Sequence, residues 1–340
     1  ANEIIARADA KSGKLHYVKI PHAAAYTPQD RTAGSWTPCT TATAAKFTAA
    51  GYFFAEMLND VLGVPVGIID CSWGGSRVES WMSREVLSGY SDIDLTEEGI
   101  SRVAQHLRPM VMYNAMLRPV AGYTVRGFLW YQGESNVGRY MDYAARLADM
   151  VSLWRGLWAQ DDLPFYYVEI APFEYGNGKS PYLREAQCRA QELIPNSGMI
   201  CTNDLVEPYE FCNVHPKNKR DVGYRLAFMA LNKTYGMKEI ACQSPQYESM
   251  EIRDGKARIR FKYMDQGFNR MADIRGFEIC GAEKVFYPAD AVVENQFALV
   301  VSSEKVPEPV AVRYCFRDFQ PGNLADTREL PVVPFRTDDF

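Results

Sequence analysis

Over the first 240 residues, patterns typical of helices alternate with short apolar runs typical of buried strands. Such alternation predicts a parallel sheet with helices on both faces, that is, a three-layer α/β/α architecture. The helix patterns cover residues 43–63, 108–119, 140–158, 181–194 and 215–236. The strand patterns between them cover residues 64–70, 124–132, 164–172 and 198–204.

Beyond residue 240 the helical periodicity disappears. Apolar and polar residues alternate in "MEIRDGKARIRFKYM", "RGFEICG", "QFALVVSS" and "PVAVRYCF", with Gly, Asp and Pro turns between these segments. This alternation of apolar and polar residues between turns indicates a small antiparallel β module. We therefore predict an α/β domain at residues 1–238 and a C-terminal β module at residues 239–340.

Composition excludes several classes of function. A net charge of −5 and a pI near 5.6 give no basic surface for nucleic acid or an anionic membrane. No run of 18 apolar residues is present, and the first residues lack the layout of a signal peptide. The eight scattered cysteines leave both disulfides and buried thiols open. With four histidines and no HExxH motif, we expect no metal and no cofactor.

Polar loops follow the predicted strands and are the natural place for a binding site. In parallel sheets, ligands bind at the carboxyl ends of the strands. We expect four loops to converge there, namely "CSWGGSRVESW", "YQGESNVGR", "APFEYGNGKSP" and "NDLVEPYEFCNVHP".

The second of these loops contains the segment "WYQGESN". A nucleophile elbow, G-x-S-x-G, would need glycine where Val137 stands, so Ser135 is a poor nucleophile candidate. The carboxamide of Gln132 can hold a developing oxyanion or can simply tie loop backbone together. In the first loop, Gly74 and Gly75 permit a close approach of backbone N–H groups to a ligand, although paired glycines are also ordinary turn formers.

The fourth loop ends in His215, directly before Pro216. Because proline suits the first helical position, we expect this imidazole at a helix N-terminus beside the strand ends. Histidine is a suitable general base at neutral pH. The alternative is a histidine that only caps the loop. His16 and His22 fall in a segment predicted to be irregular.

Several blocks together resemble a known family. "FTAAGYFFAEMLNDVLGVPVGIIDCSWGGSRVESW", "MVMYNAMLRP", "GFLWYQGESN", "YLREAQ", "VHPKNKRDVGYRLA" and "LPVVPFRTDD" are similar to blocks of the sialate O-acetylesterase family, within the SGNH-hydrolase superfamily and related to acetylxylan esterases. These blocks occur in the same order as in the family and extend over nearly the whole chain. The resemblance implies a three-layer α/β/α (flavodoxin-like) hydrolase that removes acetyl groups from sugar hydroxyls through an acyl-serine intermediate.

The resemblance also implies roles for individual residues. His215 matches the family's general base, Gln132 the oxyanion side chain, and Gly74 the backbone oxyanion donor. Glu134 and Asn136 complete the "QGE-x-D/N" block. Glu134 is expected to organise the loop or to assist the histidine.

The sequence departs from the family pattern in two ways. The family's nucleophilic serine belongs to a "GQSNM" block that these 340 residues lack. We expect that segment to be missing and to be a partner carried elsewhere, for example on a separate chain. The family's "D-x-x-H" aspartate is replaced by Cys212, so either Asp204 or a backbone carbonyl is expected to orient His215.

Substrate contacts are predicted in the same loops. Trp73, Gly75, Asn136 and Tyr175 are candidates for contact with an O-acetylated sugar. Arginine side chains would instead bind the carboxylate of a sialic acid in bidentate fashion, and the candidates are Arg77 and Arg184.

Three hypotheses remain open at this point. The first, which the resemblance favours, is a carbohydrate O-acetylesterase acting on 9-O-acetylated sialic acid. The others are an acetylxylan esterase of the same superfamily and a noncatalytic carbohydrate-binding protein. Because relatives act on glycans, we expect a secreted or periplasmic location, or a lysosomal one in a eukaryote.

Overall fold

The computed structural model describes residues 1–269 and 271–340. The helices are α1 (Asn2–Ala8), α2 (Ala49–Leu62), α3 (Arg84–Leu87), α4 (Glu97–Ser101), α5 (Tyr143–Leu157), α6 (Ser180–Leu193) and α7 (Lys219–Lys233). The strands of the first part are β1 (Leu15–Lys19), β2 (Thr37–Pro38), β3 (Val66–Asp70), β4 (Phe128–Trp130), β5 (Phe165–Val168) and β6 (Ser197–Ile200). The second part holds β7 (Gln246–Arg253), β8 (Lys256–Lys262), β9 (Phe277–Cys280), β10 (Tyr287–Pro288), β11 (Asp290–Glu294), β12 (Ala298–Ser302), β13 (Ala311–Tyr314) and β14 (Phe335–Arg336).

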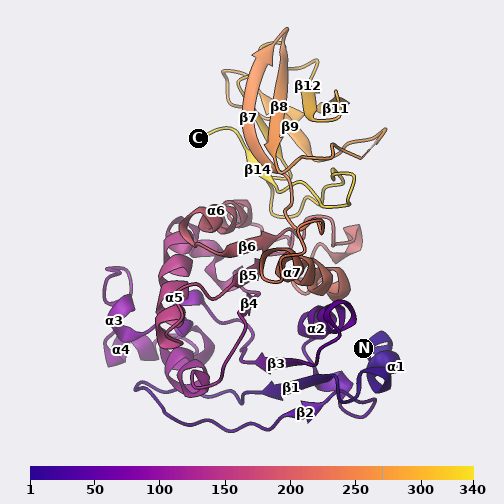
Figure 1. The fold of residues 1–340 in the computed structure, drawn as a ribbon. Coiled ribbons are helices and arrows are strands. Elements are labelled where there is room, and N and C mark those ends of the chain that lie inside the picture. The colour runs from indigo at the N-terminus through magenta and orange to yellow at the C-terminus, as the bar shows by residue number, and fades with distance from the viewer. Residues whose placement is uncertain (270) are drawn as a thin grey trace.

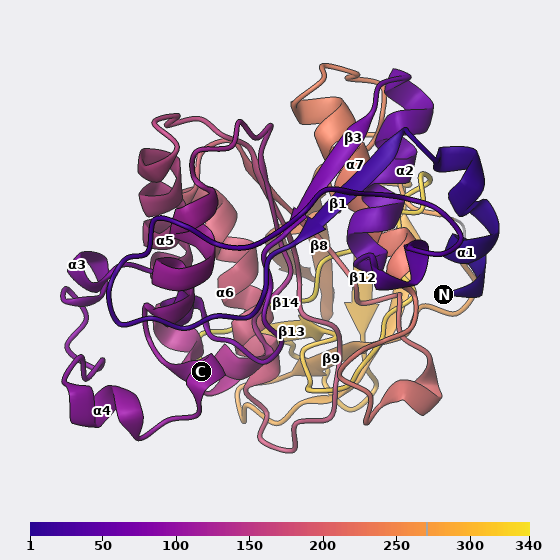
Figure 2. The same cartoon turned by 90° about the horizontal axis from the view of Figure 1, so that it is seen from below.

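The first part has the predicted α/β architecture. β1 and β3 pair in parallel, as do β4, β5 and β6. Helices α5 and α6 lie on one side of the strands, and α2 and α7 lie on the other (Figures 1 and 2). The strands form two three-stranded sheets, β2-β1-β3 and β4-β5-β6, rather than one continuous sheet.

Most predicted elements are confirmed, and two expectations for the first 120 residues were wrong. His16 does not lie in an irregular segment, because it is part of β1, which pairs with β3. Residues 108–119 do not form one regular helix: a π-helix at Tyr113–Leu117 leads into a 3₁₀ turn at Arg118–Val120, which contains Pro119. α2 ends as predicted at Gly63, whose φ of 69° places it in the left-handed region.

Aromatic packing fills the space between α5 and the β4-β5-β6 sheet. The Trp154 ring makes edge-to-face contacts with Phe128, Trp130 and Phe165, at centroid distances of 5.3, 5.5 and 6.2 Å. Such pairs contribute about 0.5–1.5 kcal/mol each beyond the area that they bury. This packing holds α5 against β4 and β5.

The second part is the predicted antiparallel β module. Its strands form two four-stranded sheets, β10-β9-β13-β14 and β11-β12-β8-β7. Asp318 connects it to the loop that follows β5, because its carboxylate accepts hydrogen bonds from the backbone N–H groups of Asn177, Gly178 and Ser180 at 3.0, 2.8 and 3.2 Å. The β module thus helps to position one of the four candidate loops.

Candidate functional site

The loops after β3 and β4 meet at the carboxyl ends of their strands. Gln132 Nε2 donates to the Ser76 carbonyl at 2.9 Å, and Ser135 Oγ donates to the Gly75 carbonyl at 2.7 Å. Arg77 Nε donates to the Ser135 carbonyl at 3.2 Å. These hydrogen bonds join the loops after β3 and β4, as expected for loops at the carboxyl ends of parallel strands. We call this edge of the molecule the rim.

The carboxamide of Gln132 is fully engaged in holding this rim. Besides the bond to Ser76, Nε2 donates to Asn136 Oδ1 at 2.7 Å, and Oε1 accepts from the Tyr143 hydroxyl at 3.0 Å. An amide nitrogen has two hydrogens, so both are used. The arrangement matches the alternative in which Gln132 ties loop backbone together.

Asn136 belongs to the interior of the rim. Its side chain is fully buried, with Oδ1 accepting from Val78 N–H at 3.1 Å and Nδ2 donating to Glu79 Oε2 at 2.9 Å. A sugar cannot reach a side chain that is fully buried, so the predicted substrate contact of Asn136 is corrected to a structural role. Glu79, itself buried, also accepts from Arg139 and Arg146.

The two glycines of the first loop differ. Gly75 has a φ of +76°, and an added Cβ would lie 3.2 Å from His106 Cδ2, so a side chain there is disfavoured. Gly74 has open space around it. Both glycines are exposed, and within the described residues the Gly74 N–H donates no hydrogen bond. Within the described residues the Gly75 N–H donates none either, so both glycines offer a backbone donor that a ligand can reach.

Trp73 precedes these glycines and stacks on His22, with ring centroids 4.5 Å apart and an interplanar angle of 5°. His22 is exposed and follows β1. Sequence reasoning set His22 aside because its segment contains no recognisable pattern. The parallel pairing of β1 with β3 brings it to the rim.

Glu134 is the ionisable centre of the second loop. Burial raises its pKa above the ordinary 4.5, while backbone hydrogen bonds and the charges of His215 and Lys219 act in the opposite direction. Burial lowers the pKa of Lys219, whose Nζ donates to the Tyr131 hydroxyl at 3.1 Å.

His215 lies in the fourth loop and is exposed. Its backbone N–H donates to Asn213 Oδ1 at 3.0 Å. The predicted helix start at Pro216 is wrong: α7 begins at Lys219, because Asn218 caps it by accepting from Asp221 N–H at 3.2 Å. The imidazole thus stands on a loop before the helix rather than at its first turn.

Asp204, the candidate carboxylate partner of His215, is paired with Arg225 instead. Both carboxylate oxygens of Asp204 accept from Arg225, at 2.7 and 2.6 Å. Among the described residues, no hydrogen bond joins Asp204 to His215. Cys212 is an exposed free thiol.

The two candidate arginines occupy different environments. Arg184 is only 1% exposed, and its Nη2 donates to the carbonyls of Cys315 and Arg317 at the β module. A sugar carboxylate cannot reach it, so its predicted substrate contact is corrected to a structural one. Arg77 is half-buried on the rim and uses Nε for the loop contact with Ser135.

Tyr175 reaches the same region from the third loop. The Glu134 charge adds to the effect of burial in raising the pKa of its hydroxyl. That hydroxyl is buried without a hydrogen-bond partner in the part of the chain that the structure describes. Most buried side-chain hydroxyls have a hydrogen-bond partner, so this one stands out.

The described residues contain no group of three or more His, Cys, Asp or Glu side chains suited to a metal ion. All eight cysteines are free. No helix of residues 1–269 and 271–340 has the length and apolar character needed to cross a membrane.

Comparison with known proteins gives a consistent result. Residues 22–232 match the family model described as carbohydrate esterase, sialic acid-specific acetylesterase. The chain is 27% identical over 275 residues to sialate O-acetylesterase of Mus musculus, and 28% identical over 249 residues to that of Homo sapiens. These matches cover 68% of this chain and 51% and 48% of the relatives, so the chain spans about half the length of the curated relatives it matches.

Among solved structures, a carbohydrate acetylesterase from Xanthomonas citri superposes with a TM-score of 0.89 at 33% identity. That match covers 100% of this chain and 76% of the Xanthomonas chain. The family model spans all four candidate loops, including Gln132 and His215. The chain therefore belongs to the sialic acid-specific acetylesterase family of carbohydrate esterases.

Proposed function

We propose that this protein is a carbohydrate O-acetylesterase that removes acetyl groups from sugar hydroxyls. The carrying observation is the match of residues 22–232 to the acetylesterase family, which includes the loops that carry Gln132 and His215. The similar Xanthomonas structure is also described as a carbohydrate acetylesterase.

In the proposed reaction, a serine hydroxyl attacks the acetyl carbonyl carbon while His215 takes the hydroxyl proton. The bond between the carbonyl carbon and the sugar oxygen then breaks, and that oxygen receives the proton from His215. Water, deprotonated by His215, attacks the acetyl-serine, and acetate leaves as the serine recovers its proton. The Gly74 N–H is the proposed oxyanion donor.

The nucleophilic serine is proposed to come from polypeptide outside these 340 residues. The rim serines form other hydrogen bonds: Ser72 Oγ donates to Asp70 at 2.5 Å, Ser135 Oγ donates to Gly75, and the buried Ser76 Oγ accepts from Trp81 at 2.9 Å. Glu134 rather than Asp204 is the proposed electrostatic partner of His215, because Arg225 neutralises Asp204.

Sialic acid is the proposed substrate because Arg77 offers a cation on the rim. In the described part of the chain, its Nη1 and Nη2 atoms donate no hydrogen bond. A guanidinium edge of this kind suits a carboxylate. Trp73 and Tyr175 are proposed to contact the sugar ring. A secreted or periplasmic location is proposed because such glycans are exposed there, and cell fractionation tests it.

Acetate release by the protein in its natural, full-length form tests this function. We expect hydrolysis of 9-O-acetylated sialic acid to exceed that of acetylated xylan, and Arg77→Ala to reduce only the former. Faster release from xylan that is unaffected by Arg77→Ala would favour the acetylxylan esterase. Tight sugar binding without hydrolysis of either substrate would favour the noncatalytic protein.

A further inference from the structure

Lys219 occupies an unfavourable position for a lysine. It is the first residue of α7, directly after the cap residue Asn218. The partial positive charge of a helix N-terminus disfavours a cation there. The Lys219 side chain is also half-buried, and burial lowers its pKa. Two separate effects therefore oppose an ammonium group at this position.

The ammonium group of Lys219 binds one tyrosine. Its Nζ donates to the Tyr131 hydroxyl at 3.1 Å and lies 4.8 Å from the centroid of the Tyr131 ring. Burial raises the pKa of this hydroxyl, so at neutral pH it is uncharged and accepts the hydrogen bond. Within residues 1–269 and 271–340, the Lys219 side chain forms no other hydrogen bond. The contact combines a hydrogen bond with a cation–π attraction.

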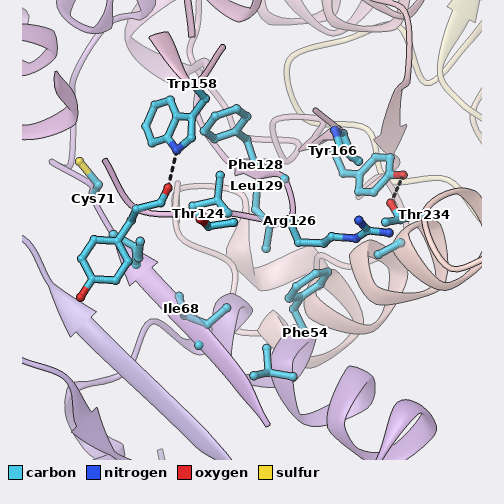
Figure 3. Close-up of a pocket in the computed structure, with 18 of the residues that line it drawn as sticks. Phe54, Ile68, Cys71, Thr124, Arg126, Phe128, Leu129, Trp158, Tyr166 and Thr234 are labelled. Atoms are coloured by element: carbon cyan, nitrogen blue, oxygen red, sulfur yellow. Dashed lines mark hydrogen bonds between the residues drawn. The ribbon is translucent and has the colours of Figure 1, made fainter. Parts of the chain in front are cut away.

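Tyr131 directly follows β4 and points toward α7. Successive side chains of an extended segment point to opposite sides, so Phe128 and Tyr131, three positions apart, face opposite ways. Phe128 contacts Trp158 at the end of α5, with ring centroids 5.1 Å apart (Figure 3). Tyr131 packs instead against a buried cluster that includes Val222 and Leu226 of α7.

Lys219 lies on the face of α7 that packs against this cluster. Positions i, i+3 and i+7 of a helix share one face, and here they are Lys219, Val222 and Leu226. Val222 and Leu226 are buried. The first turn of α7 therefore presents an ammonium group to the end of β4, on the face where later turns present apolar side chains.

The contact joins the segment of His215 to the segment of Gln132. Lys219 follows His215 by four residues, and Tyr131 directly precedes Gln132. In the part of the chain that the structure describes, this is the one hydrogen bond between the second loop and residues 203–219. It therefore links the candidate base to the rim.

Hydrogen bonds also hold the chain between His215 and Lys219. Lys219 N–H donates to the Lys217 carbonyl at 2.9 Å, and Lys217 N–H donates to Glu210 Oε1 at 3.0 Å. Glu210 is buried, and its Oε2 accepts from Glu207 N–H at 3.0 Å. A displacement of Lys219 is therefore passed on to the backbone that carries His215.

We propose that Lys219 is a positioning residue, whose contact with Tyr131 fixes the backbone of His215 relative to the rim at Gln132. In this role Lys219 touches no reacting atom. The unfavourable placement of its ammonium group is then retained for function at a cost in stability. The positioning role rests on the proposed function, because His215 is the general base there.

Hydrolysis of 9-O-acetylated sialic acid by the full-length protein tests this role. Lys219→Met keeps a long side chain but removes the donor. We expect kcat to fall by about 10- to 100-fold, because misplacement of a reacting group by about 1 Å has effects of this size. KM should change by less than about twofold, because no substrate contact is lost. Lys219→Arg keeps a donor for Tyr131 and should recover kcat to within about threefold of wild type.

Lys217→Met is the matched control. The Lys217 ammonium group also lies 4.8 Å from the centroid of an aromatic ring, that of Tyr209, but both side chains are exposed. Only the Lys217 backbone takes part in holding the segment before α7, so kcat of this variant should equal that of wild type. Tyr131→Phe removes the acceptor from Lys219. Combined with Lys219→Met, it should lower kcat no further than the larger single loss, because both changes remove one bond.

Amide hydrogen exchange of the full-length protein gives a second measurement that does not need activity. In Lys219→Met, the amides of residues 209–217 should exchange about tenfold faster than in wild type. The amides of α7 from Val222 onward should keep their wild-type rates. The urea midpoint of Lys219→Met should not fall, because burial and the helix N-terminus both disfavour the charge that is removed.

The two measurements together decide the role of Lys219. Unchanged kcat and exchange in Lys219→Met would overturn the proposal, as would a rise in KM alone, which would make Lys219 a substrate-binding residue. A lower urea midpoint with faster exchange throughout α7 would also overturn it, because Lys219 would then only stabilise the helix. Additive losses of Lys219→Met and Tyr131→Phe would exclude the contact as the cause.

A loss of kcat without faster exchange of residues 209–217 would overturn positioning in favour of direct catalysis. Failure of the proposed function gives a different result. If these residues exchange faster in Lys219→Met but the wild-type protein hydrolyses no acetyl ester, the contact positions the loop and the proposed function fails.

Discussion

The side-chain nitrogen of Gln132 lies 2.9 Å from the carbonyl oxygen of Ser76 and joins the end of β4 to the loop after β3. One amide thus fixes two loops that are more than 50 residues apart in the sequence. We predict that Gln132→Ala lowers the free energy of unfolding by about 1–3 kcal/mol, because it leaves buried polar partners unpaired. Urea unfolding measures this change.

The exposed Gln105→Ala serves as the control for this variant and should unfold within error of the wild type. Unchanged stability of Gln132→Ala, together with a large loss of kcat in the full-length enzyme, would contradict the structural role. It would instead favour an oxyanion donor.

Gly133 leaves no room for a side chain. An added Cβ would lie 2.6 Å from Ile170 Cγ2 and 3.0 Å from Gln187 Nε2. We predict that Gly133→Ala destabilises the protein by about 1–3 kcal/mol through overpacking. Gly138→Ala in the same loop has nothing within 4 Å and should have little effect. Equal thermal midpoints of the two variants would show that the Ile170 side chain yields to the added methyl group.

The buried Glu79 compensates the charge of Arg146, which is 1% exposed. Removing one partner of a buried pair typically costs about 3–5 kcal/mol. Glu79→Ala should therefore lose stability on this scale in urea unfolding. Glu98→Ala, which removes the exposed pair with Arg102, should leave the midpoint unchanged. A small effect of Glu79→Ala would mean that Asp92 alone neutralises Arg146.

The raised pKa of Glu134 predicts a pH dependence with a definite sign. Between the ordinary value of 4.5 and the higher folded value, the folded state binds more protons than the unfolded state, so stability falls as the pH rises through this window. Glu134→Gln removes this contribution. Its stability relative to wild type should therefore increase as the pH rises above 4.5. Parallel stability curves would contradict the burial of this carboxylate.

The pKa of Asp318 predicts a pH dependence of stability with the opposite sign. Burial acts to raise its pKa, but hydrogen bonds from Gly178, Ser180 and Asn177 outweigh burial and hold the pKa below the ordinary 3.8. The stability that this carboxylate contributes is present above pH 3.8 and is lost as the pH falls through the folded value. Asp318→Asn should destabilise the protein at pH 7, with a difference that shrinks in acid. The exposed Asp290→Asn is the control.

Much of the fold follows from local pattern. The apolar runs before Glu169 and Cys201 predicted β5 and β6 because strands buried on both faces leave a continuous apolar signal. β1 escaped prediction because "LHYVK" mixes polar and apolar residues in five positions. The interruption between β3 and β4 is a property of tertiary pairing, which no local pattern records.

The location of the site could be predicted from the sequence, whereas most of its side-chain contacts could not. Loop order after parallel strands predicted the rim that Gln132 and Ser135 help to form. The burial of Arg184 and Asn136 depends on the β module and on Glu79, which are distant in sequence. The stacking of His22 on Trp73 likewise depends on strand pairing.

The most direct measurement of the central claim is acetate release by the full-length protein carrying His215→Ala, compared with wild type and with His16→Ala on β1. The account predicts a loss of about a thousandfold or more for His215→Ala, because acyl transfer then lacks its base. It predicts a rate close to wild type for His16→Ala. A His215→Ala variant that stays folded and retains activity within tenfold of wild type would contradict the account.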